Sequence, residues 1–98
     1  MIIVTGSVVL KEENLEQALA LSLEHVRRSR AEAGCLAHAV HQDVENPLRL
    51  VFVEEWADQA ALAAHFAEPA SRAFARALGA LAVEPPQLQV FEARRTIG

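Results

Sequence analysis

Trp56 and His65 are the residues of this chain whose types and spacing best suit chemistry on a small molecule. An indole offers a flat apolar wall and one N–H donor, and an imidazole can accept a proton near neutral pH. Trp56 ends a predicted strand and His65 lies about two turns into the next predicted helix, so both can line one cavity. The alternative is that Trp56 is a core residue and His65 a buried, hydrogen-bonded histidine.

Four further polar residues could join this site. Glu54 would share a strand face with Trp56, and a carboxylate near the core must be paired or neutral. Arg76 is one candidate partner for it; alternatively, Glu54 lies solvated at the rim of the sheet. Arg76 could instead bind an anionic substrate or lie on the surface. His38 and His25 either line the pocket or cap a polar edge.

Local spacing gives no metal, nucleophile or nucleotide signature. His38 and His41 are an odd number of residues apart on one predicted strand, so they point to opposite faces and cannot chelate one ion together. No two histidines have helical i, i+4 spacing, and Cys35 is the only cysteine. A metal site would have to be assembled from distant elements. With no nucleophile elbow and no glycine-rich phosphate loop, we expect neither a metal nor a cofactor.

The composition predicts one small domain, residues 1–98, with an apolar surface to cover. Hydrophobic residues make up 52% of the chain, and the net charge of −4 argues against nucleic acid as the main ligand. No apolar run approaches the roughly 20 residues that cross a bilayer, and the N-terminal sequence lacks the basic region of a signal peptide. We therefore expect a cytoplasmic protein without a membrane segment.

The sequence predicts four strands and three helices. Strands are expected at residues 2–10, 35–43, 50–56 and 88–93, and helices at 14–33, 58–69 and 69–82. Asp58 suits the N-cap of the second helix, and Gly34 suits the left-handed position after the first. With right-handed crossovers, the order βαββααβ predicts an α+β, ferredoxin-like fold: a four-stranded antiparallel sheet with helices on one face.

Helices can cover only one face of such a sheet. If Phe52, Glu54 and Trp56 face the helices, then Val51 and Val53 remain on the open face. An apolar patch of this kind needs a partner, and a symmetric dimer that joins two sheets would bury it. We therefore predict a homodimer.

The chain also resembles a known family, the antibiotic biosynthesis monooxygenase domains, which include quinol and polyketide monooxygenases. The motifs that carry the resemblance are Ala33-Gly34-Cys35-Leu36, Glu54-Glu55-Trp56, Asp58, Leu62, His65 and Pro69. The resemblance spans nearly the whole chain in element order. It implies a dimeric α/β barrel, in which two sheets pack together and each subunit has a pocket between sheet and helices.

The same resemblance implies cofactor-independent oxygenation of a quinol or other phenolic substrate by O₂. An electron-rich phenolate can itself give an electron to O₂, so the protein need only bind the ring, help deprotonate it and exclude water. On this hypothesis His65 is the base or donor, and Arg76 stabilises anionic oxygen. The residues expected to bind the aromatic ligand are Trp56, Phe52, Leu62, Phe66, His38 and Glu54.

The chain departs from the polyketide-oxidising members of the family, which use an asparagine and a tyrosine beside the tryptophan and arginine. It has no tyrosine, and Phe52 and Leu62 stand where those two polar groups are expected. Two alternatives remain. One is a haem-degrading enzyme with His65 as the iron ligand, for which the first strand offers Thr5 and Ser7 but no asparagine. The other is a non-catalytic dimeric module that binds a small molecule.

Overall fold

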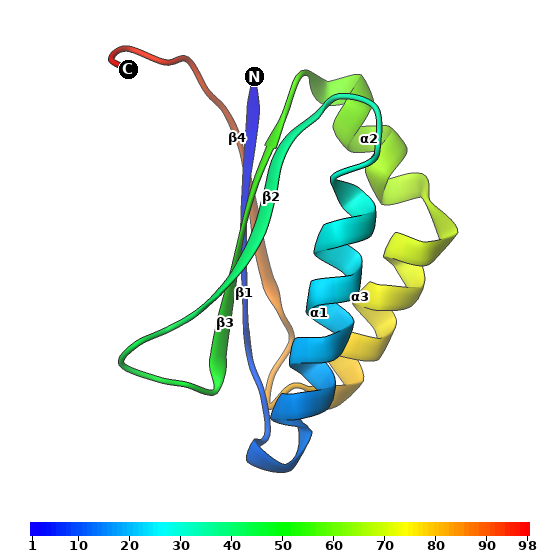
Figure 1. Cartoon of the computed structure of the whole chain (residues 1–98), viewed down its shortest axis with the longest axis vertical. Helices are drawn as coiled ribbons and strands as arrows, with labels where there is room; N and C mark the ends of the chain where they lie inside the picture. Colours follow the sequence, from blue (N-terminus) through cyan, green and yellow to red (C-terminus); the bar gives the residue numbers. More distant parts are fainter.

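A computed structural model describes the whole chain, residues 1–98, as one layer of strands and one layer of helices (Figure 1). Its elements in order are β1 (Ile2–Val9), a short 3₁₀ helix η1 (Glu12–Asn14), α1 (Leu15–Ser29), β2 (Cys35–Gln42), β3 (Arg49–Trp56), α2 (Gln59–Ala67), α3 (Pro69–Leu81) and β4 (Gln87–Glu92). The predicted order βαββααβ is confirmed. No helix combines the length and the apolar character needed to cross a lipid bilayer.

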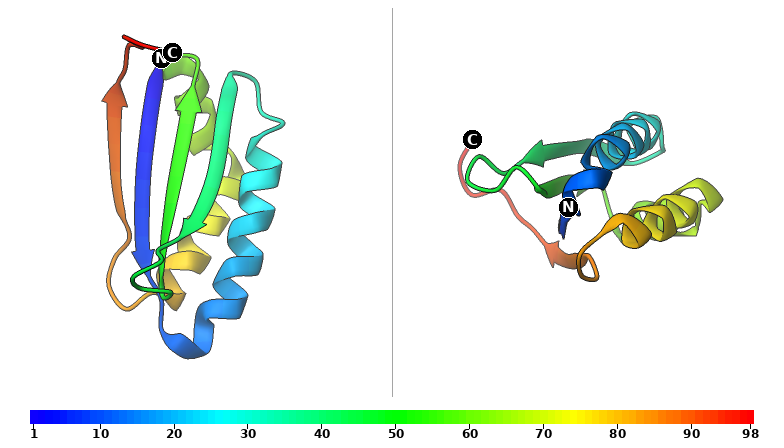
Figure 2. Two further views of the ribbon diagram at one scale, coloured as in Figure 1. Left: turned by 60° about the vertical axis from the view of Figure 1, so that its left-hand side comes forward. Right: turned by 90° about the horizontal axis from the view of Figure 1, so that it is seen from below.

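The four strands form one antiparallel sheet in the order β2-β3-β1-β4. The helices cover one face of this sheet and leave the other open (Figures 1 and 2). This is the ferredoxin-like arrangement of an α+β fold, as the sequence predicted.

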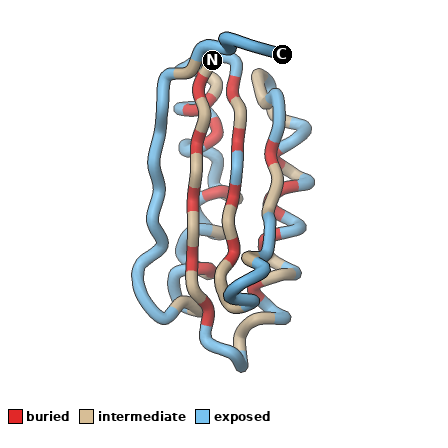
Figure 3. Tube along the Cα trace, turned by 90° about the vertical axis from the view of Figure 1, so that its left-hand side faces the viewer, coloured by how far each residue is buried: buried red, intermediate tan, exposed pale blue.

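The central strand β3 shows why one face is covered and the other is not. Its residues alternate, with Phe52, Glu54 and Trp56 buried toward the helices and Val51 and Val53 only partly covered on the open face. Strand β1 alternates in the same way, and Figure 3 shows both strands as bands of buried and partly exposed residues. The edge strand β4 is exposed along its whole length.

Two local features predicted from the sequence, a helix N-cap at Asp58 and a left-handed residue at Gly34, are confirmed. Asp58 caps α2, because its Oδ1 accepts a hydrogen bond of 2.9 Å from the backbone N–H of Ala61. Gly34 adopts a left-handed conformation with φ of 80°. A Cβ atom at Gly34 would lie 2.5 Å from the Cβ of Ala61, so the turn into β2 packs directly against α2.

The core has two apolar parts, separated along β3 by a polar residue. One part includes Leu50 and Phe52, and the other is built around Trp56 and Leu62. Glu54 lies between them on the same buried face of the strand. A charged side chain in this position is costly unless polar groups meet it, and the site described below supplies them.

Candidate functional site

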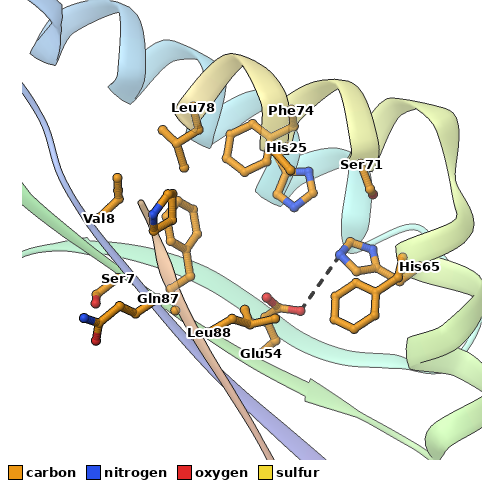
Figure 4. A pocket seen from close by; sticks show the side chains of 15 residues that line it. Ser7, Val8, His25, Glu54, His65, Ser71, Phe74, Leu78, Gln87 and Leu88 are labelled. Carbon is orange, nitrogen blue, oxygen red and sulfur yellow. Dashed lines mark ion pairs between the residues drawn. The ribbon is translucent and has the colours of Figure 1, made fainter. Parts of the chain in front are cut away.

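A cavity of about 230 Å³ lies between the sheet and the helices (Figure 4). Residues from β1, β3, all three helices and the start of β4 line it. Its apolar walls include Val8, Phe52, Phe66, Phe74, Leu78 and Leu88, and its polar lining includes His25, Glu54, His65 and Ser71. The volume is just below the range of about 300–1,000 Å³ that is usual for drug-sized ligands, so it suits a molecule with one or two rings.

The structure brings together most of the site residues that were predicted from the sequence. Phe52, Glu54, His65 and Phe66 line the cavity. Trp56, Leu62 and His38 are buried beside it and do not belong to its lining. Arg76 is exposed on α3 and lies outside the cavity lining.

Glu54 is buried, with 5% of its surface exposed, so it does not lie solvated at the rim of the sheet. The suggested partner, Arg76, is also wrong. Instead, Oε1 of Glu54 accepts a 2.9 Å hydrogen bond from Nε1 of Trp56. The same oxygen lies 3.4 Å from Nε2 of His38 and 3.9 Å from Nε2 of His65. Arg76 is on the exposed side of α3, whereas the groups that reach Glu54 lie between the sheet and the helices.

These neighbours decide the charge of Glu54. Burial acts to raise the pKa of this carboxyl group, but the His38 imidazole, the Trp56 N–H and the His65 imidazole together outweigh it. The pKa of Glu54 therefore lies below its usual value, and the group is a carboxylate at neutral pH.

His65 is held in one orientation by a second carboxylate. Its Nδ1 lies 2.8 Å from Oε1 of Glu32, and its ring lies 4.6 Å from that of Trp56, centroid to centroid. Because a carboxylate only accepts hydrogen bonds, Nδ1 carries a proton, which leaves the Nε2 lone pair of the neutral ring on the side of Glu54. Figure 4 shows this ring directed toward Glu54 across the cavity.

His25, which the sequence only weakly indicated, is fixed in the opposite tautomer. Nη2 of Arg28 donates to its Nδ1 at 2.9 Å, because a guanidinium can only donate, so the neutral ring carries its proton on Nε2. The ring stacks on Phe74 at 4.0 Å. Burial, followed by the nearby His38, His65 and Arg28, lowers the pKa of His25 from 6.5 to about 3. His25 is therefore a neutral donor beside the cavity.

Together with His38, these residues form a cluster of three buried histidines. One ring nitrogen of each of His25, His38 and His65 lies within 4.8 Å of those of the other two. Neither ring nitrogen of His38 has a hydrogen-bond partner, although its side chain has no exposed surface. The cluster draws on α1, β2 and α2, so the spacing of histidines along the sequence gave no sign of it.

Ser71 is a further polar residue that sequence reasoning missed. Its hydroxyl lies in the cavity lining without a hydrogen-bond partner, and its side chain is almost completely buried. No motif surrounds it, and a serine in the first turn of a helix usually signals only the helix start. The cavity therefore offers an acceptor at His65 and donors at His25 and Ser71 within apolar walls.

A ferredoxin-like domain with an apolar pocket between its sheet and helices defines a class of small α+β proteins, and comparison with known proteins places the chain within it. The antibiotic biosynthesis monooxygenase family matches residues 1–77. The chain therefore belongs to the antibiotic biosynthesis monooxygenase family, as the motifs around Trp56 and His65 indicated.

Solved structures of related proteins agree with this assignment. A crystal structure described as an antibiotic biosynthesis monooxygenase is 29% identical, with a TM-score of 0.89 over 97% of this chain and 100% of its own. A Deinococcus radiodurans protein, described as a candidate member of the same group, is 26% identical, with a TM-score of 0.95 over 100% of this chain and 97% of its own. Neither description names a substrate.

A curated relative, protein sll1783 of Synechocystis sp., is uncharacterized. It is 28% identical over 95 residues, which are 97% of this chain and 65% of the relative. The chain thus spans about two thirds of the length of this relative.

Proposed function

We propose that this protein is a cofactor-independent monooxygenase that oxidises a quinol or other phenolic ring with O₂. One observation carries the proposal. Glu32 binds Nδ1 of His65 and so directs Nε2 of the same ring to the wall of an apolar cavity of about 230 Å³. Family membership supports the reaction class, and the cavity supports an aromatic substrate of one or two rings.

The first step would be removal of the phenolic proton by Nε2 of His65. The imidazolium that forms lies between two carboxylates, with Glu32 at Nδ1 and Glu54 3.9 Å from Nε2. Both negative charges stabilise this cation, so they favour proton transfer to His65. His65 and Glu54 are buried and Glu32 is half-buried, so little water screens these interactions.

The phenolate then supplies the electrons that O₂ requires. One oxygen atom of O₂ becomes a new carbonyl oxygen on the ring, and the other leaves as water. A phenol and O₂ thus give a quinone and water, and the substrate provides all four electrons. The step therefore needs no external reductant, and the protein contributes proton transfer, positioning and exclusion of water.

The structure supports different roles for the other expected residues. Phe52 and Phe66 would pack against the ring, joined by Phe74. The Trp56 N–H is already bound to Glu54, so Trp56 would position Glu54 and His65 rather than contact the substrate. Arg76 lies outside the cavity lining, and we assign it no step. The cavity is much smaller than a haem, which weighs against the haem-degrading alternative.

An oxygen electrode tests this function directly. Protein treated with a chelator and supplied with a panel of hydroquinones and naphthols is expected to consume one O₂ per molecule oxidised, faster than autoxidation. Heat-denatured protein at the same concentration is the control for trace metals and uncatalysed oxidation. If a phenol binds, detected by quenching of Trp56 fluorescence, but O₂ uptake stays at the autoxidation rate, the non-catalytic binding module replaces this proposal.

We also propose that the working form is a homodimer joined through the open face of the sheet. On that face Ile3, Val51 and Val53 remain partly exposed in the single chain, and Phe91 is 47% exposed on the adjoining strand. Light scattering at micromolar concentration is expected to give twice the chain mass of 10.7 kDa. A monomer mass would contradict the dimer. Val53→Glu, which places a charge on this face, is expected to shift the protein toward the monomer.

A further inference from the structure

We propose that His38, His65 and Glu54 form a binding site for one divalent transition-metal ion, with His25 beside it. Two imidazoles and one carboxylate are a ligand set that suits Fe²⁺, Co²⁺ or Zn²⁺. The proposal goes beyond the metal-free reaction above and does not depend on it.

Two of the three distances between ligand atoms are close to those of a metal site, and the ring nitrogens of His38 and His65 lie within 4.8 Å of each other. Oε1 of Glu54 lies 3.4 Å from Nε2 of His38 and 3.9 Å from Nε2 of His65. Metal–ligand bonds of about 2.0–2.2 Å place neighbouring ligand atoms about 3 Å apart. Movements of less than about 1 Å would therefore close the set around an ion. All three side chains project from the sheet or from a helix packed on it, which limits their motion.

Two of the ligands already have the outer partners that are usual in metal sites. Glu32 holds Nδ1 of His65 at 2.8 Å, which directs Nε2 inward. The N–H of Trp56 holds the Glu54 carboxylate at 2.9 Å. Such partners orient the ligating atoms and fix the tautomer of the histidine.

His38 supplies an independent observation. Its side chain has no exposed surface, Nδ1 has no hydrogen-bond partner, and Nε2 faces only the Glu54 carboxylate at 3.4 Å, without a well-formed hydrogen bond. A buried imidazole that has lost water and makes no well-formed hydrogen bond is costly. In the tautomer with its proton on Nδ1, Nε2 of His38 would offer a lone pair to an ion that it shares with Glu54.

His25 lies beside the site without serving as a ligand. Nδ1 of His25 is engaged by Arg28, so its Nε2–H is a donor and not a metal ligand. His25 would therefore donate to a water molecule or substrate oxygen bound on the side of the ion that faces the cavity.

Titration with Co²⁺ tests the site. Chelator-treated protein without a histidine tag is expected to bind one Co²⁺ per chain, with visible d–d absorption and quenching of Trp56, the only tryptophan. His38→Gln is expected to weaken Co²⁺ binding at least about 10-fold. The matched control is His41→Gln, which alters an exposed histidine on the same strand and is expected to bind like the unaltered protein.

Several results would overturn the proposal. They are the absence of a d–d spectrum in the unaltered protein, equal affinities for His38→Gln and His41→Gln, and a stoichiometry other than one. The spectrum of the unaltered protein decides the question even if His38→Gln does not fold.

Since the Nε2 lone pair of His65 cannot hold a metal and accept a proton together, Co²⁺ is also expected to inhibit metal-free turnover. Binding without turnover would reject only the proposed function, and turnover by chelated protein that binds no Co²⁺ would reject only the metal site.

Discussion

Replacing His65 by glutamine is expected to lower hydroquinone turnover by about 10²–10⁴-fold, the usual contribution of a general base. Glutamine can still form a hydrogen bond with Glu32, but it has no basic nitrogen to accept the phenolic proton. The measurement is kcat from O₂ uptake per folded chain, with circular dichroism and light scattering beside it. Because His65 is only 3% exposed, stability must be measured on the same samples.

Two further variants separate a catalytic role from a structural one. Glu32→Gln keeps a hydrogen-bonding group near Nδ1 but removes one negative charge beside the imidazolium, so a smaller loss of kcat is expected. His41→Gln, opposite Val51 on the open face of the sheet and away from the cavity, should leave kcat unchanged when light scattering gives the same assembly as for the unaltered protein. If His65→Gln lowers the unfolding midpoint while turnover per folded chain stays the same, His65 is a core histidine and the proposed base is wrong.

Replacing Trp56 by alanine is expected to destabilise the fold by about 3–5 kcal/mol, the usual cost of deleting a buried aromatic side chain. Trp56 has no exposed surface and forms the centre of one of the two apolar parts of the core. Its loss would also leave the Glu54 carboxylate without its closest donor. Urea denaturation measures the change in the free energy of unfolding.

The variant Trp56→Phe separates the contribution of packing to this loss of stability from that of the hydrogen bond to Glu54. Phenylalanine retains most of the apolar contact with His65 but cannot donate to Glu54, so a loss of about 1–3 kcal/mol is expected. If Trp56→Phe is as damaging as Trp56→Ala, the hydrogen bond to Glu54 dominates. If it is as stable as the unaltered protein, the Glu54–Trp56 bond contributes little and Glu54 depends on its histidines.

The sequence by itself determined the elements, their order and which side of β3 is buried. Side chains alternate along a strand, so the pattern of β3 placed Phe52, Glu54 and Trp56 on the covered face and Val51 and Val53 on the open one. Asp58 and Gly34 act within a few residues of themselves, and their roles as cap and left-handed residue were therefore predictable. These elements, with the motifs around Trp56 and His65, were sufficient to indicate the family.

Only the tertiary structure decided which polar side chains meet. Periodicity predicts the face on which a residue lies, but it does not predict the residue opposite it on another element. His25, His38 and His65 lie on α1, β2 and α2, and only the packing of both helices on the sheet brings their rings together. For the same reason Arg76, although it lies on a helix of the same layer, is exposed and makes no ion pair with Glu54, which instead meets Trp56, His38 and His65.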